Sequence, residues 1–69
     1  MTNRNILHML ALRACRDATM LKAAGEADGA QAAAENACFL TSAYLHDTDK
    51  QVDWIVQTIK DNMPGILPS

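Results

Sequence analysis

The sequence has few aromatic residues and few residues that interrupt a helix. Its 69 residues include only one Phe, one Tyr and one Trp, together with three glycines and two prolines. A chain this short buries about 60% of the surface that its unfolded form exposes. Much of its apolar content is alanine, which removes little apolar area from water on burial. We therefore expect one small domain that needs a covalent staple, a metal or a partner subunit for its stability.

Long apolar runs and a recognisable export signal are also absent. No apolar run approaches the 18 or more residues of a membrane span. Residues 6–12 are largely apolar, but Arg13 and Arg16 follow them instead of a cleavage site, which argues against a signal peptide. The pattern predicts a cytoplasmic protein that does not contact a membrane and whose cysteines are reduced.

Motifs for catalysis and for nucleic-acid binding are missing as well. The sequence has no glycine-rich phosphate loop, nucleophile elbow or HExxH pattern, so we predict no enzyme and no cofactor. Residues 47–53 begin like a calcium loop, but Val52 stands where the sharp turn needs glycine. Residues 29–49 contain no Lys or Arg, which argues against direct binding of nucleic acid by a recognition helix there.

The two cysteines and two histidines do not predict a metal site. A hairpin folded about residues 26–27 places Cys15 level with Cys38, and His8 level with His46. These levels lie ~10.5 Å apart along a helix, which is too far for one tetrahedral zinc ion with bonds of ~2.0–2.3 Å. A Cys15–Cys38 disulfide is geometrically conceivable. Small thiols at a packed edge are the favoured alternative.

The residues between the glycines and prolines favour helices. We predict one helix over about residues 3–24, capped by Thr2, Asn3 or Asn5, with Gly25 just past its end. A turn over residues 25–28 leads to a second helix over about 29–46. At its start, Asp28 and Gln31 have the spacing of a capping box.

The chain near residues 46–48 allows two interpretations. Thr48 and Gln51 can cap a third helix over about 48–62, whereas the lack of Gly or Pro also allows one long bent helix. We favour a kink or turn, followed by the third helix and a tail over 63–69 that contains Ile66 and Leu67. The predicted fold class is an all-α antiparallel helical hairpin with a possible third short helix.

Each predicted helix carries an apolar stripe at the 3.6-residue period. The stripes are Leu7, Leu10, Ala11, Ala14, Ala18 and Leu21; Ala30, Ala33, Ala34, Ala37, Leu40, Thr41 and Tyr44; and Val52, Ile55, Val56, Ile59 and Met63. We expect two hairpins to pack through remaining apolar residues into a homodimer that resembles a four-helix bundle. The predicted dimer interface consists of Met9, Leu12, Met20 and Trp54.

Phe39 is the residue that we predict to anchor another protein. It falls roughly opposite the stripe of its helix, near Ala43, so a monomeric hairpin would expose it. Aromatic side chains are preferred anchors at protein interfaces. Glu35, Asp28 and Arg16 are the candidate polar rim of this partner-binding site.

Charge is distributed unevenly along the chain. Residues 1–25 carry four basic side chains and one acidic one, a net charge of +3. Residues 26–69 carry two basic side chains and seven acidic ones, a net charge of −5. This asymmetry suits self-association or docking of the acidic half on a basic surface, and an ordinary solvated face is the alternative.

Two segments carry a resemblance to a known family. Leu10-Ala-Leu-Arg-Ala-Cys-Arg-Asp17 and Glu35-Asn-Ala-Cys-Phe-Leu-Thr-Ser-Ala-Tyr44, in a chain of this length and layout, resemble the small anti-quorum-sensing proteins of Pseudomonas phages. The resemblance implies a dimer of hairpins, made early in infection, that binds a LuxR-type quorum-sensing regulator and stops it acting on DNA. It also implies binding to the type IV pilus assembly ATPase, and it carries the role of partner anchor onto Phe39.

Two other classes of function stay open. A small secretion co-chaperone also uses short helical hairpins with apolar faces, and it should fold only with its partner. A redox or metal sensor built on Cys15 and Cys38 should change its melting temperature or its oligomeric state with oxidant or zinc.

Overall fold

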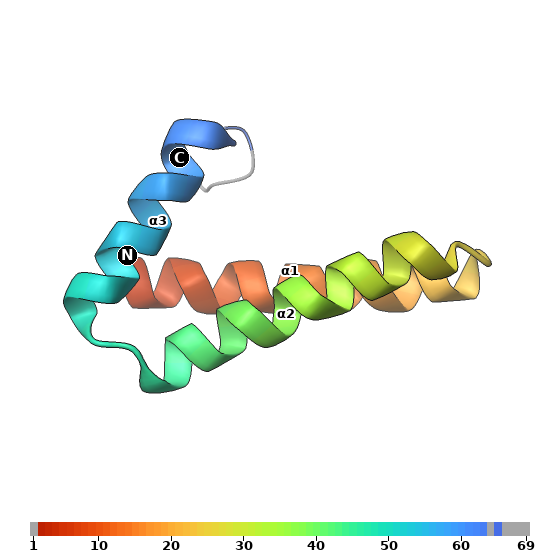
Figure 1. The fold of residues 1–69 in the computed structure, drawn as a ribbon, viewed down its shortest axis with the longest axis horizontal. Helices are drawn as coiled ribbons and strands as arrows, with labels where there is room; N and C mark the ends of the chain where they lie inside the picture. The colour runs from red at the N-terminus through yellow and green to blue at the C-terminus, as the bar shows by residue number, and fades with distance from the viewer. Residues whose placement is uncertain (1, 64, 66–69) are drawn as a thin grey trace.

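The protein folds as three helices, which a computed structural model describes for residues 2–63 and 65. Helix α1 spans Asn3–Ala23, α2 spans Ala27–His46 and α3 spans Asp49–Asn62. Figure 1 shows α1 and α2 as a long antiparallel hairpin, with α3 leaving the hairpin at an angle near the start of α1. The all-α hairpin is confirmed. Ile66 and Leu67, in the predicted tail, lie outside the described residues.

The turn between α1 and α2 forms because the end of α1 is closed by backbone hydrogen bonds. The Gly25 N–H donates to the Lys22 carbonyl at 3.1 Å, and the Glu26 N–H donates to the Leu21 carbonyl at 2.9 Å. This pair of bonds is a Schellman motif, which needs a left-handed residue just past the helix. Gly25, with φ of 80°, supplies it as predicted.

The start of α2 differs from the prediction. The helix begins at Ala27 instead of near Gly29, and its N-cap residue Glu26 makes no side-chain capping bond. The expected capping box of Asp28 with Gln31 is therefore wrong. Gln31 Nε2 instead donates to Glu35 Oε1 one turn later, at 3.3 Å. Because the Schellman motif already fixes the backbone at Glu26, the helix can begin without a capping side chain.

A break separates α2 from α3, so the interpretation of one long bent helix is wrong. Asp47 is extended, with ψ of 152°, and Thr48 follows as the N-cap of α3. The Gln51 N–H donates to Thr48 Oγ1 at 3.3 Å, and the Thr48 N–H donates to Gln51 Oε1 at 2.8 Å. This predicted capping box satisfies two backbone donors that a helix start leaves open. It stabilises the start of α3 without any glycine or proline.

The core lies where α3 meets the start of the hairpin. Its buried cluster consists of Ile6, Leu7, Leu10, Ala43, Val52, Ile55 and Val56. The stripe of α3 predicted four of its buried or half-buried positions, but Met63 is 52% exposed. The predicted stripes also missed Ile6 and Ala43, while Ala34 and Thr41 are exposed. The reason is that α3 covers a face of α1 and of α2 that a two-helix hairpin leaves open.

Arg4 binds the corner between α2 and α3 to α1. Its guanidinium donates to the carbonyl oxygens of Tyr44 at 2.6 Å and of Asp47 at 2.8 Å. It also pairs with the Asp49 carboxylate at 2.7 Å. Nearby, Asn3 Nδ2 donates to Asp53 Oδ1 at 2.8 Å. Arg4 thus satisfies carbonyls at the end of α2, where backbone acceptors lack partners within the helix.

Arg4→Met should destabilise the protein by about 1.5–3 kcal/mol, the range for hydrogen bonds to a charged group. The carbonyl bonds should carry most of this effect, because the Asp49 carboxylate is 91% exposed and exposed ion pairs contribute little. Urea unfolding of Arg4→Met beside Asp49→Asn tests this assignment. A loss of stability in Asp49→Asn as large as in Arg4→Met would show that the ion pair dominates instead.

Candidate protein-binding cleft

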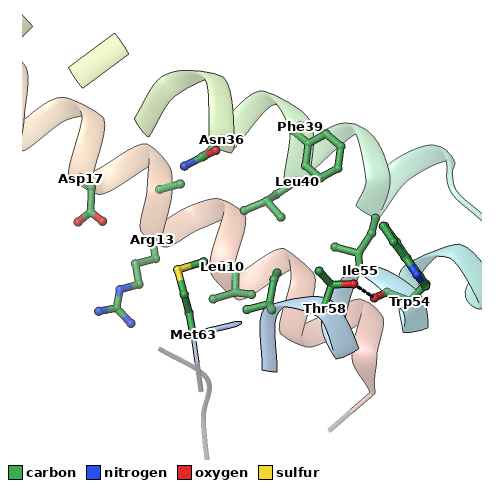
Figure 2. Close-up of a pocket in the computed structure, with 12 residues that line it drawn as sticks. Leu10, Arg13, Asp17, Asn36, Phe39, Leu40, Trp54, Ile55, Thr58 and Met63 are labelled. Atoms are coloured by element: carbon green, nitrogen blue, oxygen red, sulfur yellow. Dashed lines mark hydrogen bonds between the residues drawn. The ribbon is translucent and has the colours of Figure 1, made fainter. Parts of the chain in front are cut away.

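A cleft of about 470 Å³ opens where the three helices converge. Its volume lies within the ~300–1,000 Å³ typical of ligand pockets. Figure 2 shows side chains from all three helices around the cleft, with Phe39 on α2 and Trp54 on α3. The lining residues are Leu10, Arg13, Ala14 and Asp17 from α1; Asn36, Phe39 and Leu40 from α2; and Trp54, Ile55, Thr58, Ile59 and Met63 from α3 and its end.

The cleft combines a buried apolar floor with exposed aromatic walls. Leu10 and Ile55 belong to the core, and Leu40 and Ile59 pack against it half-buried. Above this floor, Phe39 is 60% exposed and Trp54 is 69% exposed. Two large aromatic side chains from different helices thus line one apolar hollow. Such exposed groups on a small protein mark an interaction surface.

The polar groups of the cleft lie at its edge on α1 and α2. Arg13 and Asp17 line one side, and both side chains are exposed (Figure 2). Asn36 supplies an exposed amide from α2. The Thr58 hydroxyl is already used inside α3, where it donates to the Trp54 carbonyl at 2.8 Å. An apolar centre with a polar edge is the usual anatomy of a protein interface.

The predicted partner-binding residues divide between two helices. Asp28, Glu35 and Phe39 are exposed and lie on one face of α2, because spacings of seven and four residues return to the same side of a helix. Of these three, only Phe39 lines the cleft. Arg16 lies on α1 and is not among the lining residues.

The residues predicted for a dimer interface also lie on two different surfaces. Met9, Leu12 and Met20 are exposed, and their spacing on α1 places them in one stripe together with Arg16. Trp54 instead lines the cleft on α3, in the company of Phe39. The structure therefore presents two separate apolar surfaces: the cleft, and a stripe on α1 formed by Met9, Leu12, Arg16 and Met20, which we call the α1 stripe.

The sequence did not single out Asn36 or Leu45, and it placed Met63 in the core. Asn36 and Met63 line the cleft, whereas Leu45 is 62% exposed on α2 and does not line it. In the sequence, Pro64 was the signal that could have placed Met63 outside the helix. A residue before proline is pushed away from helical backbone geometry, and Met63, with ψ of 62°, has left the helix.

The histidines and cysteines do not come together in one cluster, as a metal site would require. His8 stacks on Tyr44, with ring centroids 4.4 Å apart and the ring planes inclined by 11°. Cys15 and Cys38 are free and exposed thiols. Within residues 2–63 and Gly65, no three His, Cys, Asp or Glu side chains cluster closely enough to hold a metal ion. The same residues contain no helix that is both long and apolar enough to cross a membrane.

Comparison with known proteins adds no relative to this description. A scan against protein-family models, a search of curated proteins and a search of solved structures each found no match.

Proposed function

We propose that this chain is a non-enzymatic phage protein that binds a host protein and inhibits it. The target that the resemblance favours is a LuxR-type quorum-sensing regulator, whose binding to DNA the protein blocks in the host cytoplasm. The type IV pilus assembly ATPase is a second target by the same resemblance. The observation that carries the proposal is the cleft, in which Phe39 and Trp54 expose aromatic area above a buried apolar floor.

The aromatic pair gives the proposal its physical basis. Aromatic residues dominate binding energy at protein interfaces when they enter a pocket or accept a side chain between them. Phe39 and Trp54 belong to different helices, so the cleft can accept an apolar side chain between the elements that carry them. Because the three helices are held by the core and by Arg4, this surface is ordered before a partner arrives, which lowers the entropy cost of binding.

Charge supports a basic target. The segment that supplies α2 and α3 carries a net charge of −5, and Asp28 and Glu35 lie on the face of α2 that bears Phe39. A DNA-binding surface is basic because it must contact phosphates. An acidic surface with an aromatic anchor can dock on it and exclude DNA.

The α1 stripe supports the second part of the proposal, a homodimer. Met9, Leu12 and Met20 are 44%, 58% and 62% exposed, although they line one face of a 21-residue helix. Two copies of this stripe packed antiparallel would form the four-helix-bundle-like assembly. Such a dimer would use other residues of α1 than the cleft does, because none of the four residues of the α1 stripe lines the cleft.

Competition between this protein and DNA for a purified LuxR-type regulator tests the proposal. We expect the protein to bind the regulator and to release it from a labelled DNA site in a stoichiometric manner, with an effect that falls as salt rises. Light scattering of the protein alone reports the dimer in the same series. A monodisperse, folded protein that leaves the regulator on DNA at every ratio would refute the proposed target.

The same measurements distinguish the proposed inhibitor from the alternative function, a secretion co-chaperone. A secretion co-chaperone should be unfolded or aggregated alone and should gain cooperative unfolding only with its partner. The inhibitor should unfold cooperatively by itself.

A further inference from the structure

We propose that Asn3 and Arg4 are positioning residues for the cleft, because they hold α3, which forms one of its walls. Helix α3 and its end contribute Trp54 and Met63 to the lining, whereas α1 and α2 supply the residues that face them. The shape of the cleft therefore depends on where α3 lies relative to the hairpin. The position of α3 can be measured in the free protein, without the proposed target.

The two residues between α2 and α3 form a hinge. Asp47 and Thr48 are both extended, with ψ of 152° and 161°. The Asp47 N–H donates back to the Ala43 carbonyl at 3.1 Å, whereas the Thr48 N–H donates forward to Gln51 Oε1 at 2.8 Å. Each helix is thus closed by hydrogen bonds on its own side of the hinge. Helix α3 can therefore turn about the hinge as a complete helix, with its capping bonds intact.

Two side chains of α1 bind both sides of this hinge. On the α2 side, the Arg4 guanidinium donates to two backbone carbonyls, at 2.6 and 2.8 Å. On the α3 side, it donates to the Asp49 carboxylate at 2.7 Å. One turn further along α3, Asp53 Oδ1 accepts a hydrogen bond from Asn3 Nδ2 at 2.8 Å. We call the contacts of Arg4 with Asp49 and of Asn3 with Asp53 the latch, because they connect α1 directly to α3.

The latch lies near the hinge, whereas Ile59 and Met63 line the cleft at the far end of α3, which projects from the hairpin at an angle (Figure 1). Helix α3 has 14 residues and thus spans ~21 Å, so a turn of ~10° about the hinge moves its far end by roughly 3–4 Å. The core keeps α3 against the hairpin, but the hydrophobic effect is not directional. The latch therefore supplies the directed contacts that set the angle of α3, and with it the width of the cleft.

Residual dipolar couplings of the backbone amides measure the orientation of α3 relative to the hairpin in the full chain. The double variant Asp49→Ala with Asp53→Ala removes both acceptors of the latch. We expect the couplings of α3 to fall relative to those of α1 and α2, because α3 then moves against the hairpin. The carbon chemical shifts of α3 should stay helical, since the capping box of Thr48 and Gln51 lies within that helix. If the couplings of all three helices in the double variant fitted one alignment, as in the original chain, the proposal would be overturned.

Asp28→Ala with Asp61→Ala is the matched control for charge. It also removes two exposed acidic side chains, one each from α2 and α3, and leaves the latch intact. An equal fall of the α3 couplings in this control would show that charge, and not the latch, positions α3. Asn3→Ala reaches the latch from α1 and leaves the sequence of α3 unchanged, so we expect a smaller fall of the same kind. If α3 unfolded in the double variant, unchanged couplings in Asn3→Ala would overturn the proposal.

The effect of the latch on binding rests on the proposed function. If the double variant keeps the latched shape of the cleft for half of the time, its affinity for the regulator should fall about twofold, because only that fraction is competent to bind. Calorimetric titration of the regulator with the original chain, the double variant and the charge control measures this change. Altered α3 couplings with unchanged affinity would show that the regulator binds elsewhere than at the cleft, whereas unaltered couplings would refute the latch alone.

Discussion

Leu7→Ala should destabilise the protein by about 2–5 kcal/mol, the range for truncating a buried leucine. Leu7 has no exposed area and lies at the junction of the three helices, where Val52 and Val56 are 1% exposed. The cavity cannot collapse easily, because α1 is held on both sides by α2 and α3. Small domains have little stability in reserve, so this loss is a large part of the total. Thermal unfolding should show a midpoint lowered by at least roughly 8 °C.

Leu45→Ala is the matched control for this experiment. It makes the same substitution at a leucine that is 62% exposed on α2. Surface substitutions of this kind change stability by only about ±0.5 kcal/mol. If both variants lowered the midpoint equally, the loss would reflect something other than a buried core at the three-helix junction, such as an interface that covers Leu45.

Phe39→Ala should weaken binding to the target by about 30-fold or more, since truncating an interface anchor typically costs 2 kcal/mol or more. The fold should persist, because Phe39 is 60% exposed and does not belong to the core cluster. Titration of the regulator by calorimetry, with circular dichroism of each variant, separates the two effects. Trp54→Ala should weaken binding similarly, because Trp54 lines the same cleft.

Leu45→Ala again provides the control, now for binding. It removes an apolar side chain of similar exposure from the same helix, outside the cleft. Equal losses for Phe39→Ala and Leu45→Ala would mean that the cleft has no special role. The Trp54→Ala variant could instead dissociate the dimer and still bind the target normally. That result would show that Trp54 belongs to the dimer interface predicted from the sequence.

The local structure of this protein follows from short-range chemistry, and the sequence predicted most of it. Gly25 ends α1 because glycine readily adopts a left-handed backbone, and Thr48 with Gln51 starts α3 through a reciprocal pair of bonds. The same reasoning failed at Asp28 and Gln31. There the Schellman motif had already positioned the chain, and no side-chain cap was needed.

The sequence predicted that two residues of the candidate site are exposed, but it did not predict the site as a surface. Helical periodicity identified Phe39 and Trp54 as apolar residues that the hairpin would expose, and both are exposed. It could not show that they line one cleft, because this depends on the angle at which α3 crosses the hairpin. Periodicity describes one helix at a time and contains no information on that angle.

The sequence by itself determined the helices, their approximate ends, the antiparallel hairpin and the unequal charge of its two halves. Only the tertiary structure decided which faces are covered. Arg4 reaches the carbonyls of Tyr44 and Asp47 across some 40 residues, and this long-range contact helps place α3 over Ile6 and Ala43. The physical reason is that capping and periodicity act within one or two turns, whereas burial depends on the side chains that all three helices bring together.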